Sequence, residues 1–168
     1  MADEPLNDQI DKATAECLGM DAKDPLSNIL DQPNAELTVQ SLDDPQLLLK
    51  FAFQSPVKLA SIFIGGPAGE DLSEAPRVVK LFTNKMSMGF SDAESDAPIQ
   101  EFELTEEVLQ AGKPVPLRFV KFQNILSLQI FIEDNHGGDI TKVSRVEIFG
   151  SSGQKMDMKD WKPVKEDQ

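Results

Sequence analysis

Residues able to perform nucleophilic or metal chemistry are few in this sequence. Its 168 residues include one cysteine, Cys17, and one histidine, His136. A thiol–imidazole pair is the only cysteine-based catalytic arrangement open to them, and nothing in the sequence places the two together. A four-ligand zinc site built from Cys and His would lack ligands. Dithiol, phosphate-loop, nucleophile-elbow and dinucleotide-binding motifs are also absent from the sequence. We therefore expect neither an enzyme nor a cofactor.

Carboxylate groups offer the remaining chemistry. Asp134, Asn135 and Asp139 carry oxygen atoms suited to calcium, and the glycines between them permit a tight turn. Their spacing fits no EF-hand, and polar glycine-rich loops are commonly solvated turns. The acidic run Asp92–Asp96 is interpreted in the same way. We predict no metal site, and calcium at the first loop stays an open alternative.

The net charge of −13 limits the partners of this chain. Nucleic acid and anionic membranes would both repel it, so we expect neither as a partner. No apolar stretch approaches the length needed to span a bilayer, and the acidic N-terminus lacks the apolar core of a signal peptide. A single cysteine excludes an internal disulfide, which fits a reducing compartment. We expect a cytoplasmic or nuclear monomer.

The elements that must position any site are predicted mostly as strands. The densest apolar run, 117–132, pauses only at Gln123-Asn124, which predicts an antiparallel hairpin as the centre of the fold. Both faces of this hairpin are partly apolar, so we expect a second sheet over one face and partial cover on the other. The other expected strands are 37–42, 47–53, 57–64, 76–82, 99–104 and 140–149.

Two helices are expected. Apolar residues from Leu6 to Leu18 recur at helical spacing, which predicts a short amphipathic helix that ends at Gly19. Cys17 lies on its apolar side, so we interpret it as a buried small hydrophobe rather than a reactive thiol. A single helical turn follows Thr105, a plausible N-cap ahead of two glutamates.

About eight short strands with one or two short helices predict an all-β sandwich. At this length one domain is expected over 1–168, with a core of about 6–150 and a tail of 151–168. The architecture often hosts sugar-binding modules, so a small-ligand or carbohydrate-binding domain is the alternative function. Sugar sites stack rings on exposed aromatics, whereas this sequence has no tyrosine and its only tryptophan lies in the tail.

The tail carries apolar residues in a polar context, namely Met156, Met158 and Trp161. Two explanations are open. Trp161 folds back and caps one end of the sandwich, or the three residues anchor in a groove on a partner protein. They are the candidate partner-binding residues of the sequence.

Several segments, taken together and in order, resemble the PITH domain. They are ECLG near the N-terminus, QLLLKFAFQSPVKL, PRVVKLFTN, MGFSDAE with IQEFELT, VPLRFVKFQN with SLQIFI, and the loop from Asn135 into the last strand. This domain is known as the C-terminal part of a thioredoxin-like protein associated with the proteasome. The resemblance implies a jelly-roll β-sandwich of the galactose-binding-like type and binding to the 26S proteasome regulatory particle. With the helix expected from the spacing of Leu6 to Leu18, the expected fold is such a sandwich with a short N-terminal helix.

The resemblance supplies no catalytic residues. The chain starts directly at the PITH-like region, without a CxxC-bearing thioredoxin domain, so we expect a stand-alone family member and carry over no redox activity. The function expected from the sequence is a non-enzymatic protein-interaction module.

Overall fold

One long strand, β4 (Leu47–Gly65), pairs with neighbours in both layers of the structure. The structure is a computed structural model that describes residues 4–23, 25–30, 37–69 and 71–152. Its other strands are β1 (Glu4–Pro5), β2 (Glu16–Leu18), β3 (Val39–Gln40), β5 (Pro76–Thr83), β6 (Gln100–Glu103), β7 (Val115–Pro116), β8 (Ile125–Asn135), β9 (Lys142–Val143) and β10 (Arg145–Ser152). The helices are α1 (Ser27–Leu30), α2 (Phe90–Ser95) and α3 (Glu106–Ala111), with 3-10 turns η1 (Asn7–Gln9) and η2 (Phe119–Lys121).

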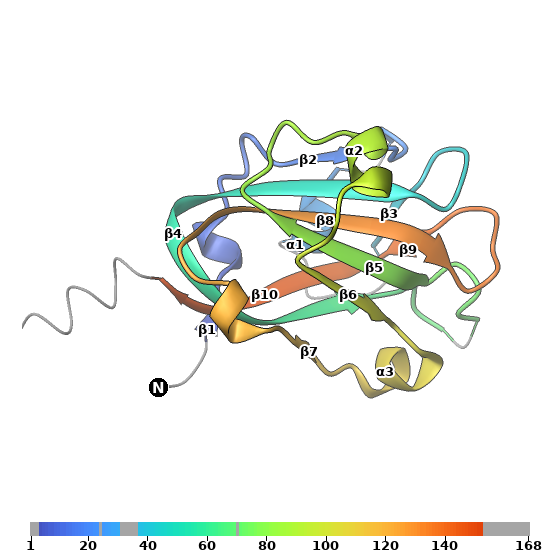
Figure 1. The fold of residues 1–168 in the computed structure, drawn as a ribbon. Helices are drawn as coiled ribbons and strands as arrows, with labels where there is room; N and C mark the ends of the chain where they lie inside the picture. The colour runs from blue at the N-terminus through green and yellow to red at the C-terminus, as the bar shows by residue number, and fades with distance from the viewer. Residues whose placement is uncertain (1–3, 24, 31–36, 70, 153–168) are drawn as a thin grey trace, which may run out of the picture.

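The strands form two layers that share β4. Its first half, Leu47–Ala52, pairs with β8 and β2, and β8 continues the layer to β5 and β6. Its second half, Val57–Gly65, pairs with β10 and β7, and β10 carries β1 at its edge. All these pairs are antiparallel, and β3 and β9 form a separate two-stranded sheet. Figure 1 shows β4 curving back at one end of the molecule to reach the second layer.

The curve falls at residues 53–56, the β4 bend, where pairing with β8 is interrupted between Ala52 and Val57. Ser55-Pro56, predicted as a break between two strands, instead lies within this one strand. Proline has no amide hydrogen to donate, so an interruption in the ladder accommodates it. The bend lets one continuous strand contribute to both layers.

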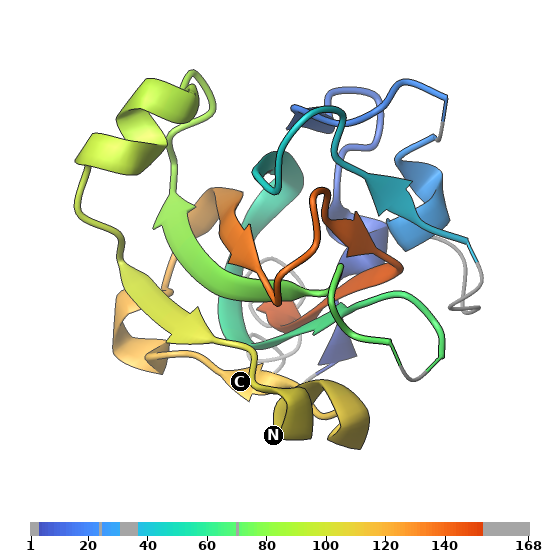
Figure 2. The ribbon, with the colours of Figure 1, turned by 90° about the vertical axis from the view of Figure 1, so that its right-hand side faces the viewer.

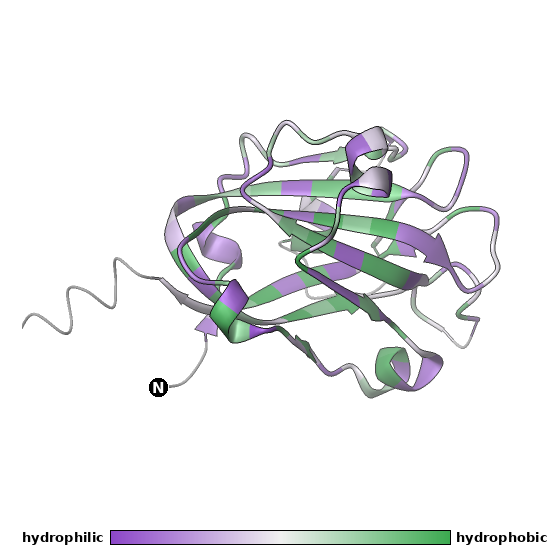
Figure 3. Cartoon of the chain, in the orientation of Figure 1, coloured by the Kyte–Doolittle hydropathy of each residue, from purple (hydrophilic) through white to green (hydrophobic). Residues whose placement is uncertain are grey.

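The core lies between the two layers. Leu47, Leu49 and Phe51 point into it from the first half of β4, as their alternation predicts. Beyond the bend, Val57 and Leu59 are buried there, and after a register shift at Ala60 the buried positions become Ile62 and Ile64. Figure 3 shows the resulting alternation of apolar and polar residues along the strands. The bulge therefore keeps apolar side chains inward along all of β4.

A second, smaller apolar cluster covers the outer face of the first layer. Buried Leu48, Phe82 and Phe131 pack there with Met88 and Ala93 from the α2 region. The ring of Phe90 meets that of Phe131 edge to face, at 6.1 Å between centroids. The expectation that β8 is apolar on both faces is confirmed. In the view turned by 90°, α2 and α3 lie at the periphery of the strands (Figure 2).

The predicted hairpin over 117–132 is wrong in its first half. Residues 119–121 form the turn η2, and β8 pairs with β4 and β5 rather than with the preceding segment. The chain must cross here from β7 in the second layer to β8 in the first, so the two halves of the run lie in different layers. Phe122 enters the core during this crossing, and its carbonyl accepts from the Leu59 amide at 2.9 Å. A positive φ at Asn124 then turns the chain into β8.

The predicted helix from Leu6 to Leu18 is also wrong. Only η1 is helical, and Glu16–Leu18 is strand β2. The backbone bonds instead to neighbouring strands, with the Leu6 amide donating to the Ile148 carbonyl and the Asp11 amide to that of Ala52. The Asn7 side chain donates to the carbonyls of Leu30 and Val146, which fixes the turn against β10.

Several local predictions are confirmed. β5 and β6 occupy the expected segments, and α3 begins after Thr105, whose hydroxyl accepts from the Val108 amide. Gly112 ends α3 in the left-handed conformation. The expected last strand is divided between β9 and β10, and the helices α1 and α2 were not among those expected from the sequence.

Gly150 offers a test of the bulge. A Cβ placed on Gly150 would collide with the carbonyl oxygen of Lys58 across the strand pair. We predict that Gly150→Ala destabilises the protein by about 1–3 kcal/mol through overpacking, lowering Tm by several degrees in calorimetry. Gly89→Ala is the control because a Cβ there meets no atom within 4 Å; as the N-cap of α2 it should cost less than the collision at Gly150, about 0.5 kcal/mol. Equal Tm values for the two variants would contradict the close approach at the bulge.

Candidate functional site

The structure does not bring Cys17 and His136 together. Cys17 lies on β2, opposite Leu49 of β4. The His136 Nε2 is 2.7 Å from the carbonyl oxygen of Leu104, just beyond β6. β2 and β6 are opposite edges of the first layer, so no thiol–imidazole pair forms. Burial raises the pKa of the Cys17 thiol from 9.0 to about 12, which suppresses the nucleophilic thiolate. The buried interpretation of Cys17 is confirmed, although on a strand and not on a helix.

The loop after β8 uses its polar groups within the protein. One carboxylate oxygen of Asp134 accepts from Arg77 at 2.9 Å and the other accepts from the Asn135 amide. The Asn135 side chain accepts from the Gly137 amide and donates to the Ile140 carbonyl. Among residues 4–152 that the structure describes, no group of three or more His, Cys, Asp or Glu side chains is arranged to hold a metal ion.

The acidic run Asp92–Asp96 has structural contacts as well. The Asp92 carboxylate accepts from the Gly89 amide at the start of α2, and Asp96 lies 3.6 Å from the Lys85 ammonium. A shallow polar pocket lies between these residues and Asn84. Asp92 thus caps the start of α2, and Asp96 pairs with a lysine.

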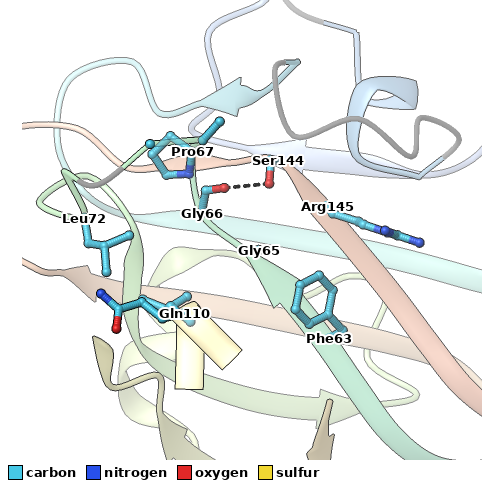
Figure 4. Close-up of a pocket in the computed structure, with 11 residues that line it drawn as sticks. Phe63, Gly65, Gly66, Pro67, Leu72, Gln110, Ser144 and Arg145 are labelled. Carbon is cyan, nitrogen blue, oxygen red and sulfur yellow. Dashed lines mark hydrogen bonds between the residues drawn. The ribbon is translucent and has the colours of Figure 1, made fainter. Parts of the chain in front are cut away.

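A larger pocket of about 400 Å³ opens beside the end of β4. Phe63 and Arg145 line one side of it, and the Ser144 hydroxyl donates to the Gly66 carbonyl at 2.6 Å (Figure 4). The Arg145 guanidinium carbon lies 6.0 Å from the centre of the Phe63 ring. Phe63 is the only aromatic residue among those that line this pocket, and Arg145 already occupies one face of its ring. Stacking of a sugar ring on that face is therefore obstructed.

An exposed apolar surface lies where the chain crosses between the layers. Val120 is 83% exposed, Phe119 49% and Leu126 52%, and they are three of the five large hydrophobic residues that are exposed in the described part of the chain. We call Phe119, Val120 and Leu126, with the exposed Arg118 and Lys121, the η2 surface. Apolar side chains stabilise a protein by burial, so exposed ones that lie close together along the chain make this surface a candidate binding site.

Hydrogen bonds hold the backbone of the η2 surface in place. The Gln100 side chain accepts from the Arg118 amide at 2.8 Å and donates to the Pro116 carbonyl, which ties η2 to β6. The Gln123 side chain donates to the Phe119 carbonyl at 2.6 Å. At the start of β8, the Asn84 side chain accepts from the amides of Leu126 and Ser127. The exposed apolar side chains therefore project from a backbone that is fixed on both sides.

Sequence reasoning missed this surface because it placed 118–122 in a paired strand. The distribution of acidic residues along the sequence could have indicated this surface. In a chain with 29 Asp and Glu, the two longest stretches without either are 45–69 and 108–132. They meet at this end of the molecule, where Val57 pairs with Ile125. The candidate residues named from the sequence, Met156, Met158 and Trp161, lie outside the described residues, so their role stays a prediction.

Comparison with protein families matches the PITH domain over residues 1–168. Thioredoxin-like protein 1 of Schizosaccharomyces pombe is 38% identical over 144 residues, which cover 84% of this chain and 49% of that protein. PITH domain-containing protein 1 of Homo sapiens is 34% identical over 112 residues, covering 67% of this chain and 51% of that protein. The chain thus spans about half the length of these relatives.

Solved structures with a similar fold include carbohydrate-binding domains. The family 32 CBM of NanJ from Clostridium perfringens, solved with galactose, has a TM-score of 0.62 at 14% identity, with 88% of this chain and 99% of that domain aligned. A fucolectin from striped bass serum has a TM-score of 0.61 at 10% identity, covering 90% of this chain and 50% of that one. The fold is therefore a jelly-roll β-sandwich of the galactose-binding-like type, as expected. At these identities the likeness concerns the fold alone.

The described part of the chain includes no helix with the length and apolar character needed to cross a membrane.

The raised pKa of Cys17 makes a direct prediction. With a pKa of about 12 instead of 9.0, the thiolate fraction at pH 8 is about a thousandfold lower in the folded protein than in the unfolded chain. We expect labelling by iodoacetamide to be slow in buffer and rapid in guanidinium. Because the folded pKa is raised, the free energy of unfolding should fall as pH rises from about 9 toward 12. Rapid labelling of the native protein at pH 8 would contradict the buried thiol.

Proposed function

The chain belongs to the PITH domain family, and from that premise we propose that it is a non-enzymatic protein-interaction module that binds the regulatory particle of the 26S proteasome. This partner is the one that the resemblance of its segments to the PITH domain implies. The fission-yeast and human relatives are about twice the length of the matched region, so the partner is proposed for the PITH region itself.

The observation that carries the proposal is the η2 surface. Its apolar side chains are exposed on a backbone fixed by Gln100, Gln123 and Asn84. A fixed surface loses little conformational entropy on binding, which favours recognition of a folded partner. The chemistry-bearing residues of the described chain support the same function, because Cys17 is buried and His136 is bonded to a backbone carbonyl. Neither side chain is arranged for nucleophilic catalysis.

Carbohydrate binding is the second candidate, and the galactose-bound fold relatives favour it. The pocket beside Phe63 is the place to test it, since it has an aromatic ring and polar groups within about 400 Å³. Against it stands Arg145, which occupies one face of the Phe63 ring, the only aromatic ring among the residues that line the pocket. Arg145 is also bonded to Glu147 at 3.0 Å, which holds it in that position. We therefore rank protein binding first.

The test uses the full chain, immobilised through an affinity tag, and purified proteasome regulatory particle measured by biolayer interferometry. We expect saturable binding with a Kd of about 10 µM or tighter, which is typical of transient assemblies of ordinary interface size. The isolated 20S core particle is the control and should not bind. Absence of binding to the regulatory particle would refute this partner. Stabilisation of the chain by galactose in thermal unfolding, lost in Phe63→Ala, would favour the carbohydrate candidate instead.

A further inference from the structure

We propose that the η2 surface docks an acidic segment of a partner protein, with Val120 and Phe119 packing against its apolar side chains and Arg118 and Lys121 pairing with its carboxylates. This inference rests on the proposed protein-binding function and adds the surface and the chemistry of the segment it recognises. Neither depends on which assembly supplies that segment.

The apolar part of the surface has no structural explanation in the described chain. Leu117 and Phe122, on either side of η2, are buried and complete the core at the crossing. Val120 lies between them and is 83% exposed, so the turn could carry a polar residue there with little loss of packing, and about half of the Phe119 side chain also faces water. Places where local sequence preference and structure disagree are often functional sites. Here β-favouring residues occupy an exposed turn, which is such a disagreement.

The positive charges of the η2 surface indicate the charge of its partner. Six described cations, such as Arg77, Lys80 and Lys142, form ion pairs with carboxylates of this chain. Within residues 4–152, excluding the parts not described, Arg118 and Lys121 take part in no ion pair. Among the described residues Lys23, Lys58 and Lys113 form none either, and of these Lys58 neighbours Leu59, which bonds to Phe122. In a chain of net charge −13, cations left unpaired beside an apolar cluster complement an acidic ligand.

Other occupants fit the surface less well. A second copy docking through the same surface would place Arg118 and Lys121 against their own counterparts, because a two-fold contact is self-complementary. An anionic membrane would attract a few cations at about 1 kcal/mol each, but its extended negative surface would also face the carboxylates around the η2 surface, whereas a short acidic segment contacts the η2 surface alone. Residues 153–168 of this chain contain four Lys and four Asp or Glu, so they offer the surface no net negative charge.

The probe is a short fluorescein-labelled peptide that alternates Asp and Glu with Leu and Phe, titrated into the full chain by fluorescence anisotropy. The matched control peptide has Lys and Arg in place of its acidic residues. A second measurement, the amide spectrum of the isotope-labelled chain, locates the site. We expect saturable binding of the acidic peptide, shifts confined to about 118–126, and weaker binding as salt screens the charges.

Four variants separate the apolar and charged contributions. Val120→Asp changes the most exposed apolar residue, and Arg118→Glu combined with Lys121→Glu reverses the charges. The controls are Leu42→Asp, at a residue 57% exposed elsewhere, and Lys23→Glu, at an exposed lysine. The two η2 variants should bind at least about tenfold more weakly, as for anchor residues of an interface, with unchanged Tm. The controls should bind as the unmodified chain does.

Several outcomes would overturn the inference. They are equal binding of the acidic and basic peptides, shifts outside the η2 surface, equal affinity of Val120→Asp, or no binding of the acidic peptide. Vesicles containing phosphatidylserine that compete with the peptide would indicate a membrane site instead. Trp161 is the only tryptophan, so a red shift of its emission in Val120→Asp without peptide would show that the chain's own tail occupies the surface.

The same variants distinguish this inference from the proposed function. If Val120→Asp binds the regulatory particle as well as the unmodified chain does, the particle is a partner and the η2 surface is not its site. If the unmodified chain binds the acidic peptide at 118–126 but not the particle, the surface stands and the proposed partner is wrong.

Discussion

The structure depends on the continuity of β4 through its bend. Because Leu47–Ala52 pairs in one layer and Val57–Gly65 in the other, the two sheets are joined by backbone hydrogen bonds as well as by side-chain packing. The interruption at 53–56 turns the strand. The bulge at Ala60 then shifts the alternation by one residue, so that the apolar side chains beyond it again point into the core. Without that shift, the apolar residues Ile62 and Ile64 would face away from the core. The end of the sandwich that carries η2 is positioned by this bend.

The outer face of the first layer is apolar, and the chain covers it with its own segments. Leu48, Phe82 and Phe131 there are covered by α2 and the loop before it. Lys50, on the same face, is almost fully buried, and its ammonium is 2.9 Å from the Met88 carbonyl and 3.1 Å from the Glu16 carboxylate. A buried charge is tolerated when it is paired and hydrogen-bonded in this way. Other segments of the chain thus cover this apolar face, whereas the apolar residues of the η2 surface remain exposed.

Sequence reasoning succeeded where structure is determined locally. The alternation in 76–82 and 99–104, and the Thr105 cap before α3, depend on neighbouring residues, and they appear as expected. It failed at Leu6–Leu18, where apolar residues at helical spacing are buried separately by contacts with β4 and β10. Such contacts join residues far apart in the chain, and no periodicity encodes them. Cys17 was nevertheless assigned correctly to the interior, because burial of a small apolar side chain is independent of the element that carries it.

The hairpin error and the η2 surface have one physical cause. A run such as 117–132 has enough apolar residues for two strands, but the crossing between layers requires a turn in its middle. Burial of Leu117 and Phe122 satisfies the core at that crossing, while Val120 between them is 83% exposed and Phe119 49%. Exposed apolar side chains bring no stability, so packing alone does not explain them there. The carbohydrate-binding domains with this fold are 9–15% identical to the chain. A shared fold at such low identity does not determine which side chains a turn exposes. Function in this chain is therefore better inferred from the residues at the crossing than from the architecture that positions them.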